Sequence, residues 1–152
     1  MIWGREVKSH IFKGWWLDTG KKDDLLEANR GVLDQFAKRD IRGQVDFRSQ
    51  IVGRVEIEAG ATIENSTIRG PVSIARDCHI KDSLIGPFTS IGRGTVIEGS
   101  SLEHSVILNS SHICRIERLE DSLIGSRVEV KKGGERGQAI RLFIGDDAKV
   151  EL

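Results

Sequence analysis

The stretch IENSTIRGPVSIARDCHIKDSLIGPFTSI, residues 63–91, shows most clearly which fold this chain adopts. Within it, aliphatic residues recur at steps of five or six: Ile63, Ile68, Ile74, Ile80, Ile85 and Ile91. An amphipathic helix needs apolar residues three or four apart, and an alternating strand needs them two apart. The sustained longer spacing fits neither element and indicates a repeat architecture.

These recurring aliphatic residues, here called the aliphatic column, continue on both sides of this stretch and define a seventeen-residue repeat. Its further members are Ile51, Ile57, Ile97, Leu102, Ile107 and Ile113. Steps of six, six and five residues lead from Ile51 to Ile68. The step from Leu102 to Ile107 has five residues where the pattern has six, which we call the slip, and the next full repeat leads from Ile107 to Ile124. We predict one triangular coil per repeat, because short strands would then pair with those of the next coil at about 4.8 Å.

Two further columns accompany the aliphatic one. Small or compact residues stand four positions after most of the aliphatics, and we expect them to point inward as well: Val55, Ala61, Thr67, Val72, Cys78, Thr89, Thr95, Val106, Ser111 and Val128. Serines that follow Asn, Asp, Gly or His are expected at stacked corners: Ser66, Ser83, Ser100, Ser105 and Ser122. The sequence thus predicts an all-β fold of seventeen-residue coils with a short α/β lead-in.

The segments that flank the repeats have other patterns. Residues 22–39 carry apolar residues at helical spacing after two aspartates, which predicts one amphipathic helix. Residues 131–138 contain three glycines and mixed charges, which predicts a loop. A terminal strand around Val150 would then cover the open coil. We therefore divide the chain into a lead-in, residues 1–40, and a repeat domain, residues 41–152.

Composition excludes several classes of function. Charged residues make up 30% of the 152 residues and the formal net charge is zero, so we expect no nucleic-acid partner. No run approaches the roughly 20 apolar residues that span a bilayer, and the first residues lack a secretory signal, so we expect a soluble, cytoplasmic protein without membrane contact. The two cysteines, Cys78 and Cys114, are predicted to be free thiols because they have no metal-type spacing.

Two short runs resemble a known family. The run GWWLDTG at residues 14–20, followed by DLLEAN at residues 24–29, resembles the end of the catalytic domain of sugar-1-phosphate nucleotidylyltransferases, specifically the long-form glucose-1-phosphate thymidylyltransferases. The resemblance continues through the repeats to the carboxyl end. It implies a left-handed parallel β-helix of hexapeptide-type repeats, with residues 1–40 as a remnant of the catalytic domain. The period alone does not fix the hand of the coil.

The resemblance also implies a role for Asp18. In the intact enzyme the matching aspartate helps to hold a catalytic magnesium ion, since hard cations prefer carboxylate oxygen. Here we favour a structural turn carboxylate, because the glycine-rich nucleotide loop and a second metal-binding aspartate are absent from the sequence. The chain alone is therefore expected to bind no cofactor and to form no dTDP-glucose from dTTP and glucose-1-phosphate.

The first functional hypothesis is a non-catalytic tail that sets the oligomeric state and holds the catalytic domains. Trp3, Trp15 and Trp16 lie in a lead-in too small to bury them, so we expect them to contact the missing catalytic domain. We expect a homo-oligomer, with a trimer favoured, that forms through outward-pointing apolar residues such as Val52, Val96 and Leu108.

Two alternatives remain open. Hexapeptide β-helices also occur in acyltransferases, where a histidine between subunits acts as the base and acyl-CoA lies along the coils. His104, between Glu103 and Ser105, is the candidate base, although neighbours on a strand point to opposite faces. The other alternative is a stand-alone scaffold or binding protein whose tryptophans dock a partner.

The remaining histidines and cysteines are expected to be structural or exposed. His79 and His112 each precede an inward isoleucine, so we predict that they face solvent without an obvious partner. Cys78 stands in the inward column and is predicted to pack there in place of Val or Ala. Cys114 is predicted to point outward, where it could react.

Overall fold

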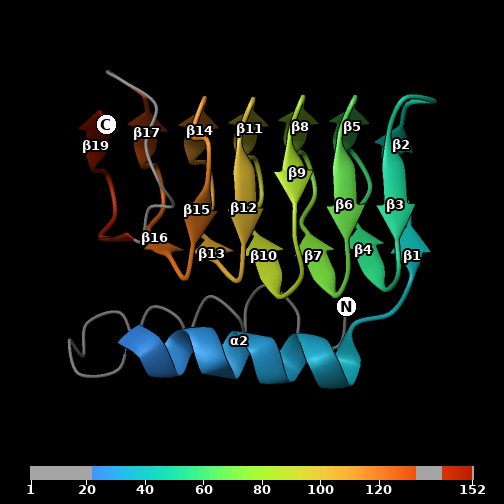
Figure 1. Ribbon diagram of the computed structural model, residues 1–152, viewed down its shortest axis with the longest axis horizontal. Coiled ribbons are helices and arrows are strands. Elements are labelled where there is room, and N and C mark those ends of the chain that lie inside the picture. Colours follow the sequence, from blue (N-terminus) through green and yellow to red (C-terminus); the bar gives the residue numbers. More distant parts are fainter. Residues whose placement is uncertain (1–21, 133–141, 152) are drawn as a thin grey trace.

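The part of the chain that the structure describes is a helix followed by a β-solenoid of three parallel sheets (Figure 1). The computed structural model describes residues 22–132 and 142–151. Successive short strands belong to different sheets, so each of the first five turns of the chain adds one strand to each sheet. The predicted fold class is confirmed: a parallel β-helix with coils of about seventeen residues and, among the described residues, one helix before it.

Each sheet contains strands that lie one coil apart in the sequence. Sheet A consists of β1 (Asp40–Ile41), β4 (Val55–Ile57), β7 (Val72–Ile74), β10 (Thr89–Ile91), β13 (Val106–Ile107), β16 (Leu123–Ile124) and β18 (Phe143–Ile144). Sheet B consists of β2 (Gln44–Val45), β5 (Thr62–Glu64), β8 (His79–Lys81), β11 (Val96–Glu98), β14 (His112–Cys114), β17 (Glu129–Lys131) and β19 (Lys149–Glu151). Sheet C consists of β3 (Gln50–Val52), β6 (Thr67–Arg69), β9 (Leu84–Ile85), β12 (Ser101–Glu103) and β15 (Leu119–Glu120).

The register of the pairs confirms the predicted period and its slip. Ile68 pairs with Ile85 in sheet C, seventeen residues on, whereas Ile91 pairs with Ile107 in sheet A, sixteen residues on. The shorter coil has one residue fewer in the corner between β12 and β13. An extra residue between β14 and β15 compensates for it, because Leu102 still pairs with Leu119.

The interior is one continuous stack of aliphatic side chains. Ile57, Ile74, Ile91, Ile107 and Ile124 are fully buried one above another in sheet A. Burial of each such side chain stabilises the fold by roughly 1.5–3 kcal/mol, so this stack is the main source of stability.

The small-residue column follows the prediction with two exceptions. Val55, Ala61 and Cys78 pack in the interior as expected. Thr67 instead lies on the outer face of β6, because it is the strand neighbour of the inward Ile68. Val106 packs against the helix, because the slip moves it to the outer position of β13.

The serine corners are stacked, but they form two columns. The Ser83 amide donates to the Ser66 hydroxyl (3.0 Å), and the Ser100 amide donates to the Ser83 hydroxyl (3.1 Å), at the corner before sheet C. Ser105 and Ser122 stack at the corner before sheet A, with the Ser122 amide 3.2 Å from the Ser105 hydroxyl. The single column predicted from the sequence is wrong at this point, because the slip brings serines to a different corner.

The corners of the first serine column begin with a residue in the left-handed backbone region. Asn65, Asp82 and Gly99 precede the first serine column with φ of 45°, 51° and 56°. Asn, Asp and Gly tolerate this conformation better than other residues. This tolerance is the physical reason for the recurrence of these residues at seventeen-residue intervals.

Helix α2 (Lys22–Phe36) lies lengthwise beside sheet A (Figure 1). It ends three residues before the predicted boundary. The next residues bind the first coils instead: the Lys38 amide donates to Glu56 Oε1, and the Arg39 guanidinium donates to the carbonyl oxygens of Ile51 and Gly53. These contacts direct the chain from the helix into β1.

The last described segment adds one strand each to sheets A and B, through β18 and β19. Of the predicted loop, Lys131 is the last residue of β17, and residues 133–138 lie outside the described part of the chain. In the described residues, no helix has the length and apolar character needed to cross a bilayer.

Candidate functional site

His104 lies at the corner between β12 and β13, and an acidic residue of the next coil binds its ring. The backbone is left-handed here, with φ of 47°, and the amide donates to the Pro87 carbonyl (3.0 Å). Nδ1 lies 2.5 Å from Oδ1 of Asp121, which occupies the same corner seventeen residues later. The coil architecture thus brings together an imidazole and a carboxylate that are distant in sequence.

The contact with Asp121 orients the ring of His104. When Nδ1 donates to the carboxylate, Nε2 carries the free lone pair of the neutral imidazole. Nε2 is buried and has no hydrogen-bond partner among residues 22–132 and 142–151. Buried polar atoms normally have partners, so the unused lone pair marks this nitrogen as the candidate atom for a ligand or a proton.

A shallow pocket of about 320 Å³ surrounds this pair. Its wall includes residues of α2 and of two successive coils: Arg30, Pro87, Phe88, Glu103, His104, Arg118, Glu120 and Asp121. The guanidinium of Arg30 stacks over the Phe88 ring, with Cζ 4.6 Å from the ring centroid. Arg118 forms an ion pair with Glu120. The pocket therefore offers two cations, an aromatic ring and the His104 and Asp121 pair.

Sequence reasoning identified His104 but not its partner. The prediction considered Glu103 and Ser105, which are neighbours along the chain, whereas the hydrogen-bonded carboxylate belongs to the next coil. The seventeen-residue separation of His104 and Asp121 is one repeat, and it was a signal in the sequence that the two residues lie in adjacent coils. The contribution of Arg30 had no signal in the sequence, because only the docking of α2 brings it to this corner.

The other predicted residues lie elsewhere. His79 is on the outer face of sheet B as predicted, but it has partners: Nε2 lies 2.9 Å from Glu64 Oε2, and Nδ1 lies 3.0 Å from Thr62 Oγ1. Cys78 is buried as predicted, with Sγ 3.0 Å from the Gly92 carbonyl oxygen. Asp18 and the three tryptophans lie outside the described residues.

The outward residues of β14 are accessible. His112 is exposed and Cys114 is half-buried, and both point away from the interior because Ile113 between them is fully buried. Both cysteines are free thiols, as predicted. Cys114 is therefore the thiol that a reagent or a metal ion can reach.

Two corner carboxylates away from this pocket have lowered pKa values. The hydroxyl of Ser49 donates to Asp46 (2.6 Å) and, with the Asn65 amide, lowers the pKa of that carboxyl. A bidentate contact with Arg127 lowers the pKa of Asp147. Both groups join successive coils, so their role is structural.

Comparison with known proteins agrees with the resemblance in the sequence. No protein-family model matches the chain. The chain is 42% identical over 149 residues to a glucose-1-phosphate thymidylyltransferase of Streptomyces antibioticus and 40% identical over 149 residues to one of Streptomyces griseus. Each match covers 98% of this chain and 42% of the relative's length.

The chain also matches, over a shorter stretch, a protein with two activities. It is a bifunctional sugar-1-phosphate nucleotidylyltransferase/acetyltransferase of Sulfurisphaera tokodaii, 33% identical over 61 residues. This match covers 40% of the chain and 15% of that protein.

Proposed function

Because the chain is homologous over 98% of its length to the carboxy-terminal part of glucose-1-phosphate thymidylyltransferases, we propose that it is the β-helix domain of such an enzyme. Its role is to set the oligomeric state and to position the catalytic domain. In the intact enzyme, a phosphate oxygen of glucose-1-phosphate attacks the α-phosphorus of dTTP, pyrophosphate leaves, and dTDP-glucose forms. Magnesium would be held there in part by Asp18.

The observation that carries the positioning role is the docking of α2 on sheet A. Leu25 and Leu26 pack with Val106 and Leu123 in a buried apolar cluster. Near the other end of the helix, the Arg54 guanidinium donates to the Asp34 carbonyl oxygen (2.7 Å). A helix that is fixed at both ends holds the chain that enters it at one place relative to the coils.

A buried polar contact fixes the middle of α2. Asn29 is 1% exposed, its amide donates to the Phe88 carbonyl oxygen (3.2 Å), and its Oδ1 accepts from the Ser90 hydroxyl (2.6 Å). A polar pair buried between helix and sheet permits one alignment, since any sliding of the helix would leave its groups without partners. The helix therefore has a defined register on the coils.

The sheet C face is suited to self-association. The α2 helix covers part of sheet A, and the outer rows of sheet B carry charges such as Glu64, Lys81 and Glu98. Over the first four coils, one outer row of sheet C has no charged residue: Gln50, Thr67, Leu84 and Ser101. The register of β12 and β15 continues this row to Arg118. Leu84, near the centre of this row, is 39% exposed. Three copies that meet along these four positions would bury no charged side chain of this row.

This surface revises part of the predicted interface. Val52 is exposed on sheet C and remains a candidate contact. Val96 lies half-buried on sheet B. Leu108 packs against the buried cluster between α2 and sheet A, so α2 already occupies its surface.

Light scattering coupled to size-exclusion chromatography tests the oligomeric role. We expect the unmodified 16.9 kDa chain to have the mass of three copies, and Leu84→Asp to shift it towards one copy. The matched control is Phe47→Asp, which adds the same charge at an apolar residue that is 95% exposed in a turn outside sheet C. A single-copy mass for the unmodified chain, or an unchanged mass for Leu84→Asp, contradicts the proposal.

The geometry around His104 favours acyl transfer as a second candidate function. An imidazole oriented by Asp121 could act as a general base, and Arg30 and Arg118 could bind phosphates of acyl-CoA. Isothermal titration with acetyl-CoA tests this candidate, with His104→Gln as the variant. Binding followed by transfer that is lost in His104→Gln would support it, whereas no binding to the unmodified chain would exclude it.

A further inference from the structure

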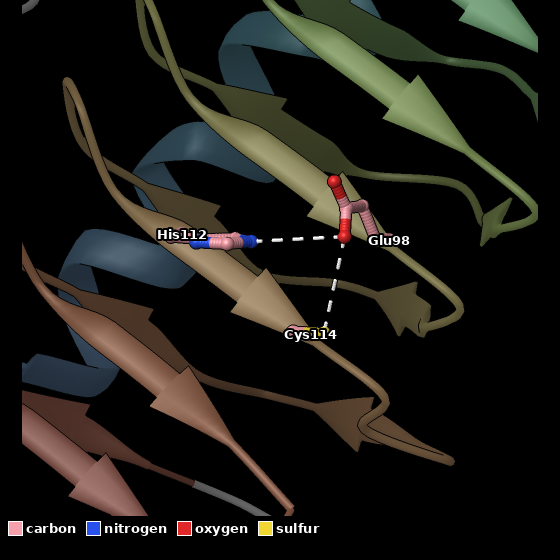
Figure 2. A group of neighbouring side chains, drawn as sticks. All are labelled: Glu98, His112 and Cys114. Atoms are coloured by element: carbon pink, nitrogen blue, oxygen red, sulfur yellow. Dashed lines mark hydrogen bonds and ion pairs between the residues drawn. The ribbon is translucent and has the colours of Figure 1, made fainter.

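Three side chains with metal-binding atoms meet on the outer face of sheet B, away from the His104 pocket. They are Glu98 of β11 and His112 and Cys114 of β14 (Figure 2). Glu98 Oε2 lies 3.9 Å from His112 Nε2 and 4.0 Å from Cys114 Sγ. All three ligand atoms lie within 4.8 Å of one another.

The separations are close to those of a tetrahedral metal centre. Zinc binds nitrogen and carboxylate oxygen at about 2.0–2.2 Å and thiolate sulfur at about 2.3 Å, which places ligand atoms about 3.5 Å apart. Shifts of less than about 1 Å in each exposed side chain would bring these atoms to that distance. One carboxylate, one imidazole and one thiolate would leave a fourth position for water.

The strands hold the three side chains in place. Glu98 pairs directly with Cys114 in the parallel register of β11 and β14, and His112 is two residues from Cys114 on the same face. Between these outward residues, Ile97 and Ile113 are 0% exposed, so the interior fixes the backbone under the cluster. Sites on rigid strands need little ordering when a ligand binds.

The preceding coils supply an internal comparison. His79 and Glu64 form a similar pair on the same face, with 2.9 Å between Nε2 and Oε2. Lys81 pairs with Glu64 there, in the row that Cys114 continues. A lysine cannot serve as a third ligand beside a metal ion, so the earlier pair is an ordinary ion pair. Only the later coil combines all three ligand types among the described residues.

We propose that Glu98, His112 and Cys114 bind one divalent cation of the zinc type. Thiolate and imidazole ligands favour zinc over magnesium or calcium, which prefer oxygen. The ion would join two adjacent coils from outside. This site is independent of the proposed role in oligomerisation, because it lies on sheet B and uses one chain.

Cobalt(II) is the probe, since its thiolate complexes absorb through sulfur-to-metal charge transfer. Titration of the chelator-stripped chain should produce this band with one ion per chain, and Zn²⁺ should abolish it by displacement. Cys114→Ser should remove the band, and His112→Gln should weaken cobalt binding by more than about tenfold. The melting temperature should also rise with Zn²⁺ in the unmodified chain and not in Cys114→Ser.

Two matched controls separate this site from other groups. Cys78→Ala removes the buried thiol, and His79→Gln removes the neighbouring imidazole, so both should retain the band and its stoichiometry. Absence of the band in the unmodified chain would overturn the proposal. So would retention of the band in Cys114→Ser, or a stoichiometry of one ion for two chains, which would mean a site shared between copies.

Discussion

The serine hydroxyls at the corners join one coil to the next. Ser83 is nearly buried, and its hydroxyl donates to the Lys81 carbonyl oxygen (2.7 Å) while it accepts from the Ser100 amide. Each serine in the column therefore satisfies a backbone donor that the turn leaves without a strand partner. This explains why serine recurs at one position of the repeat.

Loss of one such hydroxyl should destabilise the fold. We expect Ser83→Ala to lower the free energy of unfolding by about 1–3 kcal/mol, because the buried Ser100 amide loses its acceptor. Urea denaturation measures the change. Ser126→Ala is the control, since the Ser126 hydroxyl makes no hydrogen bond within the described part of the chain, and we expect a change within about 0.5 kcal/mol. Equal effects of the two substitutions would contradict this account of the serine column.

Asp46 should make stability depend on pH. Its pKa is lowered in the folded state, chiefly by the Ser49 hydroxyl, so its contribution is fully present above the unfolded pKa of about 3.9. That contribution is lost as pH falls through the lower folded pKa. We expect Asp46→Asn to reduce the melting temperature at pH 7 by more than at pH 3. Equal reductions at both pH values would show that the ionised carboxylate contributes nothing.

Residue patterns in the sequence predict packing better than they predict polar partners. The inward position of Cys78 follows from its column, because the interior admits only small residues there. The seventeen-residue step places Asp121 one coil after His104, but their hydrogen bond also depends on the left-handed conformation of both corners, which the aliphatic period does not specify. The cluster of Glu98, His112 and Cys114 similarly depends on the shorter coil created by the slip.

At the scale of elements, α2 is the feature that distinguishes this molecule from a bare solenoid. The sequence predicted its existence from helical spacing and placed its end too late by three residues. Helix propensity does not distinguish residues 37–39 from the helix before them. The contacts of Lys38 and Arg39 with the first coils explain why the helix ends earlier. The apolar spacing also could not predict which sheet the helix would cover.

The buried amide of α2 should be important for docking. We expect Asn29→Ala to lower the free energy of unfolding by about 1–3 kcal/mol, since the Ser90 hydroxyl and the Phe88 carbonyl oxygen would lose their partner. Urea denaturation followed by circular dichroism measures this change in the free energy of unfolding. Gln35→Ala, on an exposed turn of the same helix, should change stability by less than about 0.5 kcal/mol. A neutral Asn29→Ala would mean that the apolar cluster alone docks the helix.

At the scale of the whole molecule, the coils are quasi-one-dimensional, because each contacts mainly its neighbours. The end of the molecule at the first coil has exposed apolar residues: Ile41 of β1 is 37% exposed, and Phe36, the last residue of α2, is 46% exposed. The period of the sequence was sufficient to predict this architecture, since every coil repeats the same inward positions. It could not predict the alignment of α2 along several coils, which joins units that would otherwise be independent.

We infer that α2 and the β-helix form one rigid unit. Native-state amide hydrogen exchange tests it most directly, because it reports the free energy of local opening for each helix residue. We expect amides around Leu33, which is 1% exposed, to exchange as slowly as those of β7 and β10. Exchange of α2 at the rate of an isolated helix, while the strands stay protected, would contradict the claim and remove the basis for a positioning role.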